Sequence, residues 1–414
     1  MRKQARILTS GLIGAVVLGV FVTGPAAAAT APAPAAASCR NTESFANWLA
    51  KFKRDTLAQG ISQRVLDEAA PELVYDPSVI RRDRGQAIFQ ETFLSFSDKL
   101  LGGYRIPNGL KKIKQNARLF ARIERRFGVP APVLAAFWGL ESDYGGNFGK
   151  FKILPALTTL AYDCRRGAQF RPELIDGLKI VQRGDQRIPD MIGSWAGEFG
   201  GMQFTASRYI QYGVDFDGDG RIDLIHSTAD TLASAANYLK DIGWKRGEPW
   251  LQEVMVPNHM PWREADLDIQ HPVSQWVKLG VRAAHGHLPR QDLQASLILP
   301  MGRHGPAFLA YPNFQVFLHW NQSFIYSTTV AYFATRLAGA PVVNHAAAKT
   351  VKPLSIAQMK QLQTLLNRDG FDAGDVDGKL GSGTREAVKK AQLKFGMPAD
   401  SWPTYELLAK LGGG

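Results

Sequence analysis

One short segment, residues 130–146, constrains the chain more than any other. Two prolines near its start suit the first turn of a helix, and most of the residues that follow are apolar. Glu141 comes near the expected end of this helix, just before Gly145 and Gly146, which should end it. A carboxylate beside apolar and aromatic side chains loses solvation, and this favours the protonated form that a general acid needs near neutral pH. The alternative is a surface glutamate in the last helical turn, and the local sequence does not decide between the two.

The N-terminus is typical of an export signal. Three basic residues, Arg2, Lys3 and Arg6, precede an apolar run over residues 7–22, and small residues follow it. This order predicts a secretory signal peptide over residues 1–29. The alternative is an uncleaved membrane anchor, although the run is shorter than the ~20 residues that span a bilayer. In both cases we expect an exported protein, in a periplasm or elsewhere in the cell envelope.

Export bears on the charge and on the cysteines. The chain has 49 Lys and Arg against 37 Asp and Glu, a formal net charge of +12, which favours a polyanionic partner. Export argues against nucleic acid and indicates the cell wall, with a membrane contact expected only through an uncleaved signal. The two cysteines, Cys39 and Cys164, predict one disulfide in an oxidising compartment, and the alternative is two unrelated thiols.

The rest of the chain is organised as one long block and one small unit. Its composition, 45% hydrophobic and 21% charged, is ordinary for a globular protein. The expected divisions are an Ala/Pro-rich tether over 30–39, a mainly helical block with small β additions over 40–340, a linker over 341–353, and a small three-helix bundle over 354–414. The elements that apolar spacing predicts are helices over 111–127, 228–241 and 404–411, and strands over 252–256 and 296–299.

A second segment, residues 194–204, combines glycines with two polar side chains. Its glycines allow a ligand to approach the backbone closely. Ser194 and Gln203 could form directional hydrogen bonds to a neutral polar substrate. The alternative is a tight turn between two helices.

A third segment, residues 215–223, matches the first nine positions of an EF-hand loop. Carboxylates stand at positions one, three and five, and a glycine stands at position six, where the loop turns sharply. Position twelve departs from the pattern, because His226 stands where a bidentate glutamate is usual. We expect a structural Ca²⁺, and the alternative is a polar turn that binds nothing. The expected metal-binding residues are Asp215, Asp217, Asp219, Arg221 through its backbone carbonyl, and Asp230 in a longer loop.

Taken together, these segments resemble one family. The sequences ESDYG, SWAGEFGGMQF and DFDGDGRIDL, the last followed by ANYLKDIGW, resemble the membrane-bound lytic transglycosylase B family of peptidoglycan-cleaving enzymes, in order and spacing over roughly residues 40–340. The tail resembles a common C-terminal peptidoglycan-binding domain. The resemblance implies a mainly α fold, α+β in class, with a lysozyme-like catalytic core, additional helical and small β parts, and a small three-helix C-terminal bundle.

The resemblance also implies roles for individual residues. Glu141 matches the sole catalytic acid, which would protonate the MurNAc–GlcNAc bond and then, as a base, deprotonate the MurNAc 6-hydroxyl that attacks C1. The product would be 1,6-anhydro-MurNAc, and no water would be consumed. The positions that match the sugar cleft are Ser194, Gln203, Tyr238, Trp320 and Asn321. The acidic loop matches the family's EF-hand-like metal site, and no organic cofactor is implied.

Two departures from the family pattern bear on subsite preference, and other functions stay open beside the family's reaction. Trp320 stands where a tyrosine is expected, and Glu198 stands where alanine is usual. One alternative is a lysozyme-type hydrolase that uses Glu141, with Glu198 or Asp143 holding a water molecule. Another is a non-catalytic peptidoglycan-binding scaffold. In each case the expected partner is a peptidoglycan glycan strand, and proteins of cell-wall assembly are further candidates.

Overall fold

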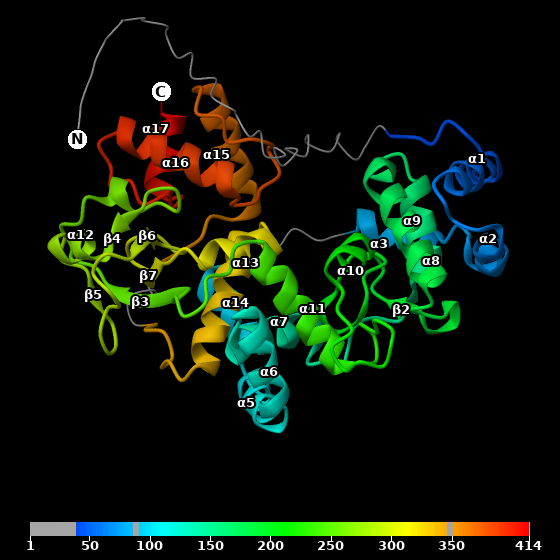
Figure 1. The fold of residues 1–414 in the computed structure, drawn as a ribbon. Helices are drawn as coiled ribbons and strands as arrows, with labels where there is room; N and C mark the ends of the chain where they lie inside the picture. Colours follow the sequence, from blue (N-terminus) through cyan, green and yellow to red (C-terminus); the bar gives the residue numbers. More distant parts are fainter. Residues whose placement is uncertain (1–38, 86–90, 346–350, 414) are drawn as a thin grey trace, which may run out of the picture.

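The computed structural model describes residues 39–85, 91–345 and 351–413, and the described part is mainly helical (Figure 1). It contains seventeen α-helices and seven short strands, which confirms the predicted fold class. The helices of the N-terminal part are α1 (Phe45–Ala58), α2 (Gln63–Ala69), α3 (Pro77–Arg84), α8 (Ile153–Tyr162) and α9 (Gly167–Arg183). Those of the central part are α4 (Phe93–Leu101), α5 (Arg105–Gln115), α6 (Ala117–Phe127), α7 (Ala131–Ser142), α10 (Ala206–Tyr212), α11 (Thr228–Asp241), α13 (Phe314–Trp320) and α14 (Phe324–Leu337).

Helix α7 lies in the middle of the central part, because nearly every side chain along it is apolar. Eight of its residues are buried, and α5, α11 and α14 pack around it. The helix ends earlier than predicted, since Asp143 already adopts a left-handed conformation with φ of 50°, before the two glycines. Asp143 accepts hydrogen bonds from Arg105 Nε and the Tyr104 hydroxyl, both at 2.7 Å, and these bonds offset the cost of that conformation.

The predicted helix over 111–127 is wrong in one respect: it is two helices, α5 and α6, that meet at Asn116. The side-chain amide of Asn116 donates to the Lys112 carbonyl at 3.0 Å, in competition with the backbone ladder. The break lets α5 pack against α7 and α14 while α6 packs against α11. The predicted helix over 228–241 is confirmed as α11.

The predicted strands belong to a five-stranded antiparallel sheet. Its order is β4-β6-β7-β3-β5, from β3 (Leu251–Met255), β4 (His271–Pro272), β5 (Arg282–Ala283), β6 (Gln294–Ile298) and β7 (Ala307–Ala310). With α12 (Val273–Lys278), the sheet encloses a second apolar core around the fully buried Trp276. A further pair, β1 (Phe151–Lys152) and β2 (Ile192–Gly193), lies beside α8.

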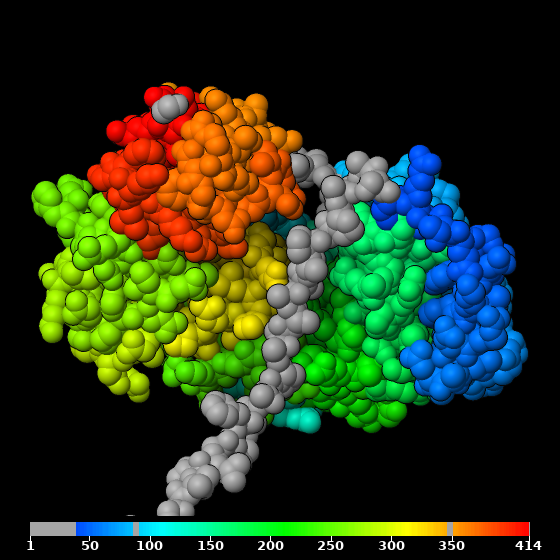
Figure 2. Space-filling model, turned by 90° about the horizontal axis from the view of Figure 1, so that it is seen from above, coloured from blue at the N-terminus to red at the C-terminus, as the bar shows by residue number. Residues whose placement is uncertain are grey.

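The C-terminal part forms a bundle with its own core. Its helices are α15 (Ile356–Arg368), α16 (Ser382–Lys394) and α17 (Tyr405–Gly412), and the last of these confirms the predicted helix over 404–411. The bundle rests on the sheet and on α14 (Figure 2). Arg385 of α16 donates to the Pro300 carbonyl at 2.9 Å, and its guanidinium lies 4.8 Å from the Phe324 ring centre. These contacts fix the bundle against the main block.

The N-terminal end of the described chain is tied to the main block by a disulfide. Cys39 is bonded to Cys164, with their Cα atoms 5.8 Å apart, as the sequence predicts. The predicted signal peptide, residues 30–38 of the tether and residues 346–350 of the linker lie outside the described residues. Among the helices of the described ranges, none has the length and the apolar character that crossing a membrane requires.

Candidate active site

Glu141 lies in the last turn of α7, beside a wall of aromatic rings. The indole of Trp320, at the end of α13, lies at the centre of this wall. Its ring centre is 4.3 Å from that of Phe137, 5.6 Å from that of Tyr238 and 5.8 Å from that of Phe204. Trp320 and Tyr238 are buried. The structure therefore brings three predicted site residues, Glu141, Tyr238 and Trp320, into one cluster.

Two donors hold one oxygen of the Glu141 carboxyl. Trp320 Nε1 donates to Oε1 at 2.8 Å, and the hydroxyl of Tyr326 donates to the same oxygen. No described residue forms a hydrogen bond with Oε2. The carboxyl is therefore fixed in orientation through one oxygen, while the other is left to carry the exchangeable proton.

The surroundings of Glu141 set its acidity. Burial raises the pKa of this half-buried carboxyl, and Glu198 nearby raises it further. The hydrogen bonds from Tyr326 and Trp320 oppose this change, and so does the charge of Arg208. The net result is a pKa of about 7, compared with an ordinary value of 4.5. Such a group is half protonated at neutral pH, which suits a residue that must first give and then take a proton.

Tyr326 was missed by the sequence analysis. It lies in the first turn of α14, and 185 residues separate it from Glu141. Its only sequence signal is its place five residues after Asn321 in the segment that begins at Trp320. Trp320 stands where the family pattern has a tyrosine, and the structure shows that its indole N–H supplies a hydrogen-bond donor at this position.

The glycine-rich segment is fixed next to α7. The hydroxyl of Ser142 donates to the Gly201 carbonyl at 2.6 Å, between α7 and the short 3₁₀ turn η3 (Gly200–Met202). A tight turn brings Ser194 N to the Glu198 carbonyl at 3.2 Å. Gly197 has φ of +78°, and a Cβ atom there would lie 2.4 Å from the Leu157 side chain, so only glycine fits. The two interpretations of this segment, a ligand-binding segment and a tight turn, are therefore compatible, since the tight turn positions the polar side chains.

Ser194 and Gln203 line a common cavity. It has a volume of about 390 Å³, and Trp195, Phe148 and Phe151 also contribute to its wall. The Gln203 amide donates to the carbonyls of Phe148 at 3.2 Å and Gly200 at 2.9 Å. These bonds fix the side chain in the wall of the cavity.

Asn321 is exposed and lies next to the aromatic wall. Its Oδ1 accepts a hydrogen bond from Ser323 N at 2.9 Å, and its carbonyl accepts from the Ser327 hydroxyl at 2.6 Å. Asn321 thus shapes the start of α14, the helix that carries Tyr326. A role in binding substrate stays a prediction.

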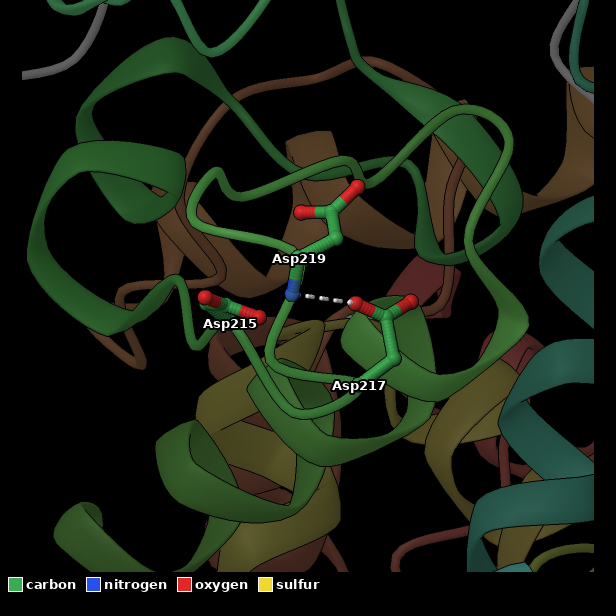
Figure 3. A group of neighbouring side chains, drawn as sticks. All are labelled: Asp215, Asp217 and Asp219. Carbon is green, nitrogen blue, oxygen red and sulfur yellow. Dashed lines mark hydrogen bonds between the residues drawn. The ribbon is translucent and has the colours of Figure 1, made fainter.

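The acidic loop gathers three of the predicted metal-binding carboxylates. Oxygens of Asp215, Asp217 and Asp219 lie within 4.8 Å of one another (Figure 3). Asp215 also accepts the backbone N–H groups of Gly218 at 2.7 Å and Gly220 at 3.0 Å, which folds the loop around it. Three hard carboxylate oxygens in a turn of this kind fit a cation such as Ca²⁺.

The other two predicted metal residues serve the loop in different ways. Asp230 is not part of the acidic group. It is fully buried in the first turn of α11, where it accepts the N–H groups of Phe216 at 2.7 Å and Asp223 at 2.9 Å. The Arg221 guanidinium is 3.3 Å from an Asp219 oxygen. Asp230 therefore ties the two ends of the loop together, and Arg221 offsets part of its negative charge.

Comparison with known proteins identifies the fold class and the family of this chain. The fold is of the lysozyme-like class, with a second, C-terminal unit. The family described as Transglycosylase SLT domain matches residues 44–335, and a peptidoglycan binding domain matches residues 355–411. The chain therefore belongs to the SLT transglycosylase family.

Several relatives are named lytic transglycosylases. Membrane-bound lytic murein transglycosylase B of Escherichia coli is 32% identical over 244 residues, which cover 58% of this chain and 65% of that protein. The crystal structure of SltB3 from Pseudomonas aeruginosa in complex with NAG-anhNAM-pentapeptide is 39% identical, with a TM-score of 0.83 over 89% of this chain and all of that one. Lytic transglycosylase Slt35 of Escherichia coli, solved in complex with calcium, is 27% identical, with a TM-score of 0.60 over 70% of this chain and 92% of that one.

Proposed function

We propose that this protein is a lytic murein transglycosylase that cleaves the MurNAc–GlcNAc β-1,4 bond of peptidoglycan and leaves 1,6-anhydro-MurNAc ends. The observation that carries the proposal is the desolvated carboxyl of Glu141, which Trp320 and Tyr326 hold through one oxygen. The ligand of the similar SltB3 structure, NAG-anhNAM-pentapeptide, contains an anhydro sugar and supports the choice of product.

The reaction needs one group that acts first as acid and then as base. The protonated Glu141 gives its proton to the bridging oxygen, and the bond between that oxygen and C1 breaks. The N-acetyl group of the substrate stabilises the charge that develops at C1. The 6-hydroxyl oxygen of the same MurNAc then bonds to C1, and its proton passes to the Glu141 carboxylate. Atoms and charge balance without water, and the aromatic wall around Trp320 helps to exclude it.

A hydrolase with the same acid is the main alternative. Hydrolysis of this bond ordinarily uses a second carboxylate. Asp143 accepts from Arg105 and Tyr104, and although burial alone would raise its pKa, these hydrogen bonds lower it. Asp143 is therefore committed to the end of α7. Glu198 is the remaining candidate for holding a water molecule.

Mass spectrometry of released fragments tests the proposal. Purified sacculi are digested with the mature protein, and with the Glu141→Gln variant as a control. We expect fragments that are lighter by one water than hydrolysis products, and none with the variant. Fragments with reducing MurNAc ends would show a hydrolase, and no fragments from a folded protein would show a binding protein without this activity.

We propose further that the acidic loop binds a structural Ca²⁺. Asp215, Asp217 and Asp219 would supply carboxylate oxygens, and the Arg221 backbone would supply a carbonyl. Bound Ca²⁺ would neutralise the repulsion among the three carboxylates. Asp230 would hold the loop ends from the protein side rather than contact the ion.

We also propose that the protein is exported to the periplasm or cell envelope, after removal of residues 1–29 as a signal peptide. Under this proposal, residues 40–340 form the catalytic domain, and residues 354–414 retain the enzyme on the glycan. The disulfide between Cys39 and Cys164 fits an oxidising compartment. Sedimentation with sacculi should show that the Glu141→Gln variant binds them and that the bundle of residues 354–414 strengthens this binding.

A further inference from the structure

The hydroxyl of Ser194 has no hydrogen-bonding capacity left for a substrate. It donates its proton to Glu198 Oε2 at 2.8 Å. It accepts the N–H groups of Ala196 and of Glu198, each at 3.2 Å. A serine hydroxyl has one proton and two lone pairs, and all three are used within this turn. A protein with alanine at position 198 would leave the proton of that serine free for a ligand.

The polar atoms that Gln203 and Glu198 leave unpaired are acceptors. Both N–H groups of the Gln203 amide are used by the Phe148 and Gly200 carbonyls, which leaves its Oε1. Glu198 is half-buried, and no described residue donates to its Oε1. A ligand group that meets either of these two oxygens must therefore supply a hydrogen-bond donor.

We propose that Glu198 is a specificity-determining residue of the glycan cleft, whose carboxylate accepts a hydrogen bond from a sugar N–H or hydroxyl group. The inference rests on the proposed function, since it takes the ligand to be an N-acetylated glycan. Ser194 acts as a positioning residue that holds the carboxylate in place. It is costly to bury this carboxylate against a ligand group that cannot donate a hydrogen bond. Ligand N–H and hydroxyl groups are therefore preferred to carbonyl groups at this point of the cleft.

Burial raises the pKa of Glu198, and the charge of Glu173 of α9 adds to this change. The hydrogen bond from Ser194 opposes it, as do the charges of Arg208 of α10 and of Arg166 at the start of α9. The negative charge of Glu198 also raises the pKa of Glu141 of α7. A substitution at position 198 should therefore change both the affinity for the ligand and the pKa of Glu141.

Binding to an inactive background tests the proposal without relying on cleavage. All variants are made in Glu141→Gln, and the probes are a soluble GlcNAc–MurNAc oligosaccharide and its N-deacetylated form. We expect Glu198→Ala to weaken binding of the acetylated glycan about tenfold or more, and Glu198→Gln, which keeps a carbonyl acceptor, to weaken it less. Ser194→Ala should weaken it less than Glu198→Ala does. An unchanged affinity in Glu198→Ala, or a larger loss in Ser194→Ala, would overturn the proposal.

The second probe locates the donor. An equal loss for both glycans in Glu198→Ala indicates a sugar hydroxyl, and a larger loss for the deacetylated glycan indicates the nitrogen. Both results support the proposal.

A pH profile separates this role from a structural one. With Glu141 intact, Glu198→Gln should move the alkaline limb of kcat/KM to lower pH, because the negative charge that raises the pKa of Glu141 is gone. A variant that merely loosened the turn would lower the rate without moving the limb, and that result would also count against the proposal. If wild-type protein released no anhydro fragments while Glu198→Ala still weakened binding, the proposed reaction would fail and the binding role would stand.

Discussion

Carboxylates occupy two contrasting places in this molecule. Glu141 lies at the end of an apolar helix, among aromatic rings, and burial raises its pKa to about 7. Asp217 and Asp219 lie in an exposed loop, with backbone N–H groups and an arginine as neighbours. The same functional group is thus suited to give a proton in one place and to hold a cation in the other. The comparison teaches that desolvation and donor number, rather than residue type, decide the chemistry.

Replacement of Glu141 should have the largest effect. We expect Glu141→Gln to lower the cleavage rate by a factor of about 10³ or more, because an amide can neither give nor take the proton. Asp219→Asn, the matching carboxylate-to-amide change in the exposed loop, should retain most of the activity when Ca²⁺ is present. Release of soluble muropeptides measures both. Similar losses of activity in the two variants, with circular dichroism showing that both are folded, would contradict the proposed difference between Glu141 and the acidic loop.

The pH dependence of cleavage should follow Glu141. Because its pKa is raised to about 7, the proton that starts the reaction is present below that pH and is lost above it. We expect kcat/KM to fall about tenfold per pH unit on the alkaline side of this value. Initial rates between pH 4 and 9 would show the limb, and a rate that stays flat up to pH 9 would contradict the assignment.

Tyr326→Phe should sharpen the contrast by changing the surroundings of Glu141 alone. The Tyr326 hydroxyl lowers the pKa of Glu141, so its removal should move the alkaline limb to higher pH. The rate at the optimum should fall severalfold, since one of the two donors that orient the carboxyl is lost. Tyr332→Phe is a matched control on the same helix, because that hydroxyl contacts Val343 and Arg336. If both variants shifted the limb equally, the effect would come from α14 as a whole.

Calcium should affect stability more than chemistry. Chelation should lower Tm by roughly 2–4 °C for each kcal/mol of binding free energy that the ion supplies, and the pH limb should stay in place. Asp217→Asn should lower Tm in Ca²⁺ but not in chelator, where the loss of one of three neighbouring negative charges relieves repulsion. Calorimetry with and without chelator gives all four values. A Tm that is indifferent to Ca²⁺ would contradict the metal site.

Local patterns in the sequence were sufficient for parts of this account. The apolar run before Glu141 predicts its desolvation, and the spacing of Asp215, Asp217 and Asp219 predicts the acidic group. The donors to Glu141 could not be found in this way, since Trp320 and Tyr326 reach it from helices that follow it by 179 and 185 residues. Such contacts depend on how the helices pack, which apolar spacing does not specify.

Hydrogen bonds made by individual polar side chains explain the errors in the fold. The break at Asn116 arises from its own amide, and the early end of α7 arises from the contacts of Asp143 with Arg105 and Tyr104. The sequence pattern registers the apolar face of a helix but not these local hydrogen bonds. The same reason hid the use of the Ser194 hydroxyl by Glu198.

The titration of Glu141 tests the central claim most directly. Protein with ¹³C-labelled glutamate carboxyl groups is followed by NMR across the pH range, and the Glu141 signal is identified by its absence in Glu141→Gln. The account predicts a midpoint of about 7 for this signal, well separated from those of exposed carboxylates. A midpoint near the ordinary value of 4.5 would contradict it, because Glu141 would then be ionised at neutral pH and could not start the reaction.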